Sequence, residues 1–381
     1  MRSLLIILQL SSLLTYSRSE DDLVAVTALI RHGARIPEEL YPTDPYQNYS
    51  FPFVLGDLTN SGVNQMYTVG KWLRNRYKTF LSREYDPEEI YCQSVDYDRC
   101  LMSGSATLAG LYPPISNEVW NSRLRWQPIP IHTSPAGQDI VVNMNTCPKI
   151  PAESAVIRST QIYQDIMSKH GAFFDFISNK SGESINFSNM YPLFDTLFSE
   201  MKINLPLPEW AQKILPQMSS LIVEYTKMDS YNQVERQIQV GPMLERIVQQ
   251  FDKAINGKNF GNTRTIFRKF MAYFATEWIL YDMTYALGLP PINIPDFGAF
   301  YLFELRKNPQ SGHYVNILYK HSTNFDTAAK PAPIKGLNYN LDYTSFKNFV
   351  KPLVVNSTEW KYLCENFTGS AVSVNTNVPS S

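Results

Sequence analysis

A continuous apolar run near the start of the chain ends abruptly in a cluster of charged side chains. Residues 23–30 read Leu-Val-Ala-Val-Thr-Ala-Leu-Ile, and Arg31-His32-Gly33-Ala34-Arg35-Ile36-Pro37 follows directly. A run rich in β-branched residues, without polar alternation, predicts a strand buried on both faces, as in a parallel or mixed sheet covered by helices. Such sheets bind ligands beyond the carboxyl ends of their strands. The charged cluster is therefore the first candidate for a functional site.

Strand and helix patterns alternate on both sides of a long, mainly helical segment. Before residue 132 the periodicity predicts a helix over 58–77, a strand over 90–92 and a helix over 101–111. After residue 239 it predicts a helix from Pro242 to about Asn256, a strand over 267–275, a helix over 277–287 and a hairpin of 299–305 with 314–319. Amphipathic patterns such as 155–168 and 210–225 fill the segment between them.

This order of elements predicts an α/β fold with a doubly wound mixed or parallel sheet flanked by helices. We assign the sheet domain to residues 22–132 and 239–367, and a helical cap insertion to residues 133–238. The small and polar residues 368–381 are expected to form a flexible tail.

The N-terminus has the features of a secretory signal peptide. Arg2 precedes the apolar stretch Leu4–Leu10, and small or polar residues continue to Ser19, so we expect residues 1–19 to be removed. No stretch of the chain reaches the roughly 18–20 apolar residues that span a bilayer, and the tail has no hydrophobic end for a lipid anchor. We therefore expect a protein without a membrane anchor, secreted or held in a lysosome-like lumen.

Glycosylation and disulfide bonds are expected in that compartment. Five sequons occur, at Asn48, Asn179, Asn186, Asn356 and Asn366. The chain has four cysteines, which would be expected to pair in an oxidising lumen, with free buried thiols as the alternative. Their spacing alone does not fix the pairing.

Charge and motif content exclude several classes of function. The chain has 34 Lys+Arg against 35 Asp+Glu, so its net charge of −1 provides no broad positive field for nucleic acid. Its five histidines and four cysteines are too scattered for zinc modules. The sequence contains no HExxH, GxxxxGK[ST] or GxSxG motif, so metalloprotease, P-loop and serine-hydrolase readings lack support.

The residue types after the first strand suit phosphoryl transfer. A neutral imidazole at His32 can attack phosphorus, and the guanidinium groups of Arg31 and Arg35 can bind non-bridging oxygens in pairs. A glycine at position 33 would let the backbone approach a phosphate closely. The alternative is a buried cluster of ion pairs in which both arginines are bound by carboxylates.

The motif Arg31-His32-Gly33-x-Arg35-x-Pro37 resembles the RHGxRxP signature of the histidine acid phosphatases, a branch of the histidine phosphatase superfamily. The resemblance covers most of the chain after the signal peptide. It includes the helix 58–77, the segment Trp126–His132 and the segment Ser94–Ser103, although Gln93-Ser94-Val95 stands where the family has Arg-Ser-Thr.

The resemblance implies hydrolysis of small phosphomonoesters through a phosphohistidine on His32, without cofactor or metal. It also implies that Arg31, Arg35 and Arg99 bind the phosphoryl oxygens, that His132 contacts substrate, and that Cys147 pairs with Cys364. Cys92 and Cys100 have no counterpart, and could bridge each other or stay reduced. A homodimer is compatible with the family.

One departure from the family concerns its second catalytic histidine. The family's late His-Asp pair corresponds here to Thr276-Glu277, so the histidine is missing and a carboxyl group remains. Loss of one preorganised donor typically costs about 10²–10³ in rate. Glu277 is the candidate acid for the leaving group, or else a carboxylate that merely stabilises a helix start.

Three functions therefore compete. We expect a slow acid phosphatase, with a secreted inactive pseudophosphatase that binds phosphate esters or a protein partner as the main rival. A structural or adhesive glycoprotein is the third class.

Overall fold

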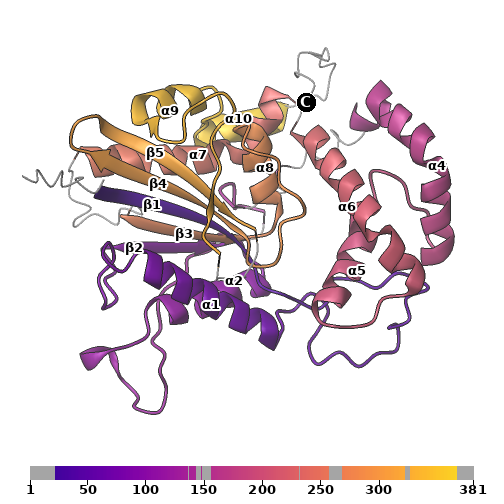
Figure 1. Cartoon of the computed structure of the whole chain (residues 1–381), viewed down its shortest axis with the longest axis horizontal. Helices are drawn as coiled ribbons and strands as arrows, with labels where there is room; N and C mark the ends of the chain where they lie inside the picture. Colours follow the sequence, from indigo (N-terminus) through magenta and orange to yellow (C-terminus); the bar gives the residue numbers. More distant parts are fainter. Residues whose placement is uncertain are drawn as a thin grey trace, which may run out of the picture.

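A mixed sheet with helices on both faces forms the larger part of the molecule (Figure 1). The structure is a computed structural model and describes residues 22–135, 137–142, 147, 156–230, 232–256, 268–321 and 327–366. The expected signal peptide and flexible tail lie outside the described residues. The described part contains no helix that is long and apolar enough to cross a membrane.

The strand order is β2-β3-β1-β4-β5-β6, with β7 also paired to β5. Strands β1 (Asp22–Arg31), β2 (Ile90–Ser94) and β3 (Phe270–Ala275) are parallel, and β4 (Phe300–Asn308) and β5 (Gly312–Lys320) continue the sheet as an antiparallel hairpin. The short strands β6 (Lys330–Pro331) and β7 (Leu341–Asp342) pair with β5. The predicted α/β fold with a mixed sheet is confirmed.

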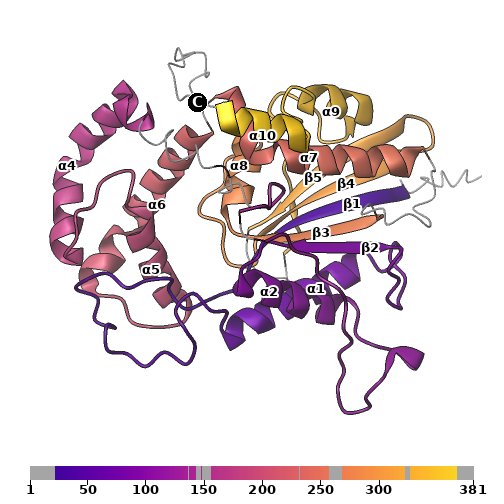
Figure 2. The ribbon, with the colours of Figure 1, turned by 180° about the vertical axis from the view of Figure 1, so that it is seen from behind.

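Side chains on alternate sides of β1 pack into two different hydrophobic clusters. Val26, Ala28 and Ile30 face the cluster formed with α1 (Asn60–Arg76) and α2 (Asp98–Leu111). Ala25 and Leu29 face the opposite cluster. That cluster is formed with α7 (Gln233–Ile255), α8 (Trp278–Ala286) and α9 (Tyr343–Val350), while α10 (Ser357–Asn366) packs on α7. Figures 1 and 2 show the two helical layers on either side of the sheet.

Gly33 lets the first helix dock beneath the charged motif. A Cβ atom at Gly33 would lie 2.6 Å from the carbonyl oxygen of Gly62, and one at Gly62 would lie 2.1 Å from that of Ala34. Both distances are far below van der Waals contact. The demand for glycine at position 33 therefore arises from the approach of α1, which the sequence interpretation did not anticipate.

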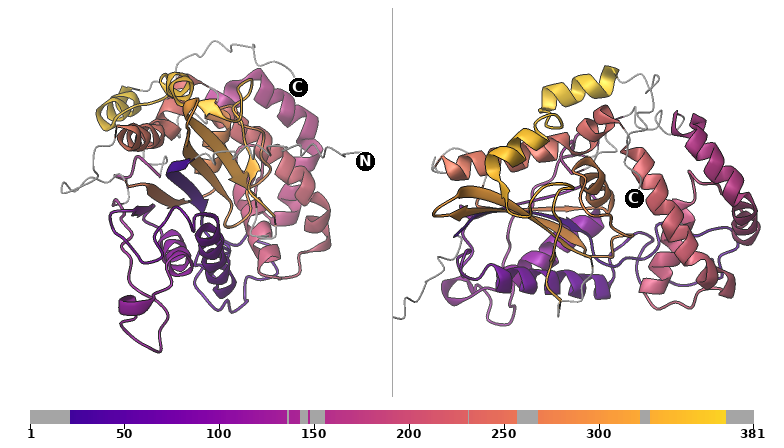
Figure 3. Two further views of the ribbon diagram at one scale, coloured as in Figure 1. Left: turned by 60° about the vertical axis from the view of Figure 1, so that its left-hand side comes forward. Right: turned by 45° about the horizontal axis from the view of Figure 1, so that its top comes forward.

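The helices α4 (Gln161–Ser181), α5 (Tyr191–Lys202) and α6 (Glu209–Asp229) form a separate group beyond the carboxyl ends of the parallel strands (Figures 1 and 3). A single turn, η1 (Ser116–Glu118), lies in the loop after α2. The predicted helix 210–225 lies within α6. The predicted helix 155–168 is interrupted: residues 156–159 are helical, and Thr160 then caps the start of α4, while residue 155 lies outside the described residues.

The start predicted for α7 is wrong. This helix begins at Gln233, and Pro242 lies inside it. Asn232 and Glu235 form a capping box, in which the Asn232 side chain accepts from the Glu235 backbone at 2.9 Å. This cap and an extensive buried face keep the helix intact through the proline. The boundary that we drew between residues 238 and 239 consequently falls inside one helix.

The cysteines divide into one bridge and two buried thiols. Cys147 and Cys364 form a disulfide with a Cα–Cα distance of 5.6 Å, as the resemblance implies. Cys92 and Cys100 are free, and they belong to hydrophobic clusters on opposite faces of the sheet. Burial raises the pKa of the Cys100 thiol to about 12.

Four of the five sequon asparagines are exposed, namely Asn48, Asn179, Asn356 and Asn366. Asn186 is half-buried, and its side chain accepts from the Ser188 backbone at 2.9 Å. Glycosylation of these sites stays a prediction.

Candidate active site

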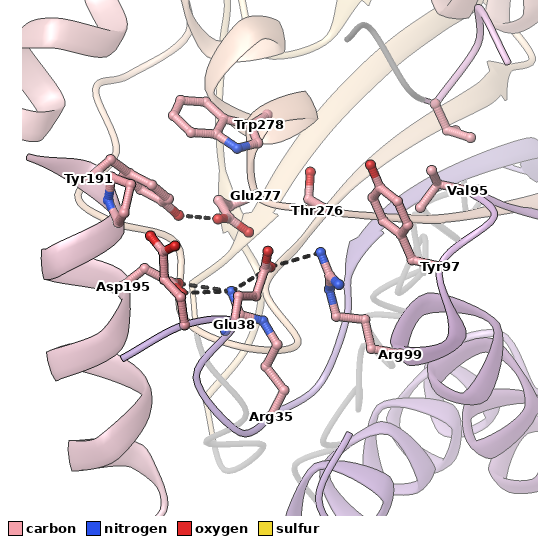
Figure 4. Close-up of a pocket in the computed structure, with 13 residues that line it drawn as sticks. Arg35, Glu38, Val95, Tyr97, Arg99, Tyr191, Asp195, Thr276, Glu277 and Trp278 are labelled. Carbon is pink, nitrogen blue, oxygen red and sulfur yellow. Dashed lines mark hydrogen bonds and ion pairs between the residues drawn. The ribbon is translucent and has the colours of Figure 1, made fainter. Parts of the chain in front are cut away.

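The carboxyl ends of the three parallel strands bring separate stretches of sequence together. Arg31 pairs with Ala275 and Ser94 with Phe274, so the segments after β1, β2 and β3 emerge side by side. Together with α5 they surround a cavity of about 400 Å³. Its walls carry two arginines, four carboxylates and several aromatic or small side chains (Figure 4): Arg35, Glu38, Glu39, Val95, Tyr97, Arg99, Val142, Tyr191, Pro192, Asp195, Thr276, Glu277 and Trp278.

His32 is held as a neutral imidazole with one free nitrogen. Its Nδ1 lies 2.9 Å from the carbonyl oxygen of Gly33, and because a carbonyl only accepts, Nδ1 carries the proton. Nε2 is buried and has no hydrogen-bond partner among the described residues. Burial lowers the pKa of the imidazole well below its ordinary value, and the charges of Arg99, Arg31 and Arg35 lower it further. The unprotonated Nε2 is therefore available as a nucleophile.

The side chain of His32 is completely buried and does not line the cavity. Its ring lies 5.6 Å from that of Phe297. Arg31 is also behind the cavity wall, with its guanidinium 4.4 Å above the same phenylalanine ring and a hydrogen bond to the carbonyl oxygen of Pro295. His32 and Arg31 are thus buried next to residues of the cavity wall and are not among its lining residues.

Arg35 is anchored by residues of α5. Its Nη2 lies 2.9 Å from both carboxylate oxygens of Asp195, and its Nη1 donates to Ser199 Oγ at 3.2 Å. Asp195 and Ser199 are four residues apart on α5, so both face the arginine from one side of the helix. Helix α5 therefore contributes directly to the position of this cation.

Arg99 reaches the cavity from the start of α2. Its guanidinium lies 4.7 Å above the ring of Tyr97 and its Nη2 is 2.9 Å from Glu38 Oε1. The same oxygen is 3.0 Å from Arg35 Nη2. The structure thus brings Arg35 and Arg99, which the resemblance groups together, onto one oxygen of Glu38.

Glu277 is the ion-pair partner of Arg31, at 2.9 Å from Oε2 to Nε, and its Oε1 accepts a hydrogen bond from Tyr191. Burial opposes ionisation, but Arg31, Arg35 and the tyrosine outweigh it and hold the pKa of the carboxyl below its ordinary value. The side chain caps no backbone group of α8. An ionised Glu277 is poorly suited to the predicted role of proton donor, and its contacts favour a role in orienting Arg31.

The structure corrects the expected place of His132. This residue is exposed, does not line the cavity and lies on the outer edge of the sheet, where its backbone bridges to β2. Its ring stacks on Tyr91 at 4.8 Å. Thr276, by contrast, lies in the cavity wall beside Glu277.

Sequence reasoning missed the contributions of Glu38, Tyr191 and Asp195. The polar pair Asp195 and Ser199, at helical spacing among apolar residues, was a detectable sign of a buried polar face. Nothing in the sequence shows that this face meets Arg35, because the two segments are far apart in the chain.

Comparison with known proteins gives a consistent assignment. The family model described as "Histidine phosphatase superfamily (branch 2)" matches residues 22–320. The chain is 30% identical to human lysosomal acid phosphatase over 353 residues, covering 91% of this chain and 81% of that protein. It is 28% identical to mouse prostatic acid phosphatase over 351 residues, covering 90% and 89%.

Solved structures of two bacterial phytases share the fold. The phytase of Citrobacter braakii superimposes with a TM-score of 0.68 at 15% identity, covering 90% of this chain and 99% of that one. The Hafnia alvei phytase bound to tartrate gives a TM-score of 0.67 at 17% identity, covering 91% and 99%. At these identities the likeness concerns the fold alone.

Proposed function

Because the chain belongs to branch 2 of the histidine phosphatase superfamily, we propose that it hydrolyses phosphomonoesters through a phosphohistidine on His32. The single observation that carries the proposal is the state of His32. Its Nδ1 proton points at a carbonyl, its Nε2 is unpartnered, and the surrounding charge is positive. A neutral nucleophile close to an anion site is what attack on a phosphate ester requires.

In the proposed reaction, Nε2 of His32 attacks phosphorus and the bond from phosphorus to the ester oxygen breaks. The alcohol leaves with a proton taken from solvent or an acid in the site, and a phosphohistidine remains. Water then attacks the phosphorus, the bond to Nε2 breaks, and inorganic phosphate leaves. Arg35 and Arg99 bind non-bridging oxygens from the cavity wall, and Arg31, which Glu277 orients from behind that wall, binds a third.

We expect turnover to be slow, and slowest for esters whose alcohol is a poor leaving group. Thr276 supplies a hydroxyl but no positive charge where the family has its second histidine. Arg31, Arg35 and Tyr191 hold the pKa of the Glu277 carboxyl below its ordinary value, so its contacts favour the ionised form over the proton donor. Esters of acidic alcohols such as phenols need no such proton and should be the better substrates.

Trapping the intermediate tests the proposal. The protein is exposed briefly to a phosphomonoester with labelled phosphorus, quenched in alkali because phosphohistidine is labile in acid, and digested for mapping. Label on His32, absent from a His32→Ala variant, is the expected result. Absence of label and of turnover, with phosphate binding retained, would instead favour the second candidate.

That second candidate is a pseudophosphatase that binds phosphate esters or a protein partner without turnover. Two observations favour it: Thr276 replaces the second histidine, and Arg35 and Arg99 both bind Glu38. For either function we propose a secreted or lysosome-like lumenal protein. The disulfide Cys147–Cys364, the exposed sequons and the lysosomal relatives support this location.

A further inference from the structure

A carboxylate of this chain lies between the two arginines that line the cavity. Oε1 of Glu38 is 3.0 Å from Arg35 Nη2 and 2.9 Å from Arg99 Nη2 (Figure 4). One anionic oxygen thus contacts both guanidinium groups, as an oxygen of a bound phosphoryl group would. We propose that Glu38 is an internal occupant of the phosphate subsite, which substrate and product must displace.

The two arginines depend on Glu38 to different extents. Arg35 keeps a second carboxylate when Glu38 leaves, because Asp195 binds it through both oxygens at 2.9 Å. Glu38 is the carboxylate that Arg99 pairs with among the described residues. Displacement of Glu38 therefore frees Arg99 for an incoming anion, while Arg35 stays fixed by α5.

Glu38 is placed so that it can move away. Its side chain is 48% exposed, whereas that of Asp195 is 7% exposed. It follows Pro37, whose carbonyl oxygen is held by the Gly56 backbone at 2.9 Å, so the local backbone can stay in place while the side chain turns into solvent. The exchange needs only a rotamer change in a half-exposed side chain.

Competition predicts a specific kinetic pattern. Glu38 opposes the binding of every phosphoryl group, and it does not touch His32. Its removal should therefore tighten substrate and product binding without accelerating the chemical step. Both ion pairs join the half-exposed Glu38 to a largely buried guanidinium group; taken at the strength of solvent-screened pairs, they correspond to about three- to tenfold in affinity. The inference rests on the proposed phosphate site but not on turnover.

The experiment measures inorganic phosphate binding to the full chain and to Glu38→Gln by titration calorimetry at low ionic strength. The matched control is Glu39→Gln. Glu39 lines the same cavity, but within the described residues the ion pairs of Arg35 and Arg99 involve Glu38 and Asp195. Both variants remove one negative charge, and only the first removes the occupant.

We expect Glu38→Gln to bind phosphate about three- to tenfold more tightly, and Glu39→Gln to change the affinity less than twofold. In an active preparation, KM for an aryl phosphate should fall by the same factor with kcat nearly constant. Weaker or unchanged phosphate binding in Glu38→Gln would overturn the proposal, since Glu38 would then organise the arginines or have no role. Equal effects of the two variants would overturn it too, because net charge alone would explain them.

These outcomes are separable from those of the proposed function. A chain that forms no phosphohistidine can still show tighter phosphate binding in Glu38→Gln, in which case the inference holds for a binding protein. Conversely, if the chain hydrolyses phosphomonoesters but Glu38→Gln leaves phosphate binding unchanged, the proposed function stands and this inference is wrong. A second variant, Glu38→Ala, should also bind phosphate more tightly. Because alanine cannot form a hydrogen bond with phosphate, this variant shows whether the tighter binding of Glu38→Gln comes from a new hydrogen bond made by glutamine.

Discussion

The substitution Glu277→Gln distinguishes two possible roles of Glu277: donating a proton to the leaving group, or orienting Arg31. The side chains of Glu277 and Arg31 are 4% and 1% exposed, and their Oε2 and Nε atoms are 2.9 Å apart. Glutamine keeps an oxygen that can accept from Tyr191 but removes the charge. Breaking a buried pair of this kind costs about 3–5 kcal/mol of folding free energy, because a buried charge is left uncompensated.

The two roles predict different dependence on the leaving group. If Glu277 orients Arg31, a shift of about 1 Å in the guanidinium costs on the order of 10²-fold in rate for every substrate. If Glu277 donates the proton, an alkyl ester loses about 10²–10⁴-fold and an aryl ester with an acidic phenol loses almost nothing. The contacts of Glu277 predict the first pattern.

The assay compares kcat/KM for p-nitrophenyl phosphate and an alkyl phosphate such as glycerol 2-phosphate, in the parent and in Glu277→Gln. This ratio reports the steps up to cleavage of the ester bond. We expect both substrates to lose activity by similar factors, agreeing within about threefold. Urea unfolding and phosphate binding show whether the variant is folded. A loss for the alkyl ester that exceeds the aryl loss by 10² or more would refute the reasoning and restore Glu277 as the acid.

Three further predictions concern other parts of the molecule. Thr276→His should raise kcat/KM for an aryl phosphate by about 10²–10³, because it returns a cationic donor to the cavity wall. No gain in a steady-state assay would show that Thr276 does not correspond to the second histidine of the family. Replacing both Cys147 and Cys364 by serine should lower the urea-derived free energy of unfolding by about 5 kcal/mol in the chain-entropy model, as the bridge closes a separation of 217 residues; a change under about 1 kcal/mol would contradict that mechanism. Glu200 is buried, and burial and the neighbouring Asp44 raise its pKa from 4.5 to about 8. The folded state therefore keeps a proton that the unfolded state releases, so the free energy of unfolding should fall as the pH rises from 4.5 to 8. In Glu200→Gln, thermal melting at several pH values should show a smaller fall over this range. A melting temperature of the parent that does not change over this range would contradict the prediction.

The parts of the fold with strong local signals were predictable. The run 23–30 is apolar on both faces and became β1. The hairpin of 299–305 with 314–319 follows from two runs rich in apolar and aromatic residues separated by the polar segment 306–313, which contains Pro and Gly. The start of α7 was not predicted, because Pro242 suggests a helix start, and its tolerance inside the helix depends on burial and on the cap at Asn232, ten residues earlier.

Residue types at the site could be predicted, but their partners could not. The cluster at Arg31–Arg35 and the departure at Thr276-Glu277 are visible in the sequence. That Glu277 binds Arg31, that Glu38 binds two arginines, and that His132 lies at the sheet edge are properties of side-chain packing between distant segments. Such pairings depend on the tertiary arrangement, which no local pattern encodes.

The hydrogen bonds and ion pair between α5 and Arg35 link the position of this arginine to the position of the helix. Since Asp195 and Ser199 lie on α5 while Arg35 follows β1, any movement of α5 relative to the sheet would shift one of the arginines that we propose to bind phosphoryl oxygens. Replacing helices α4–α6 by those of a relative would then change the affinity of the site for its ligand toward that of the relative. Sequence changes in the loops around α4–α6 could therefore alter the affinity of the site while residues 31–37 stay the same.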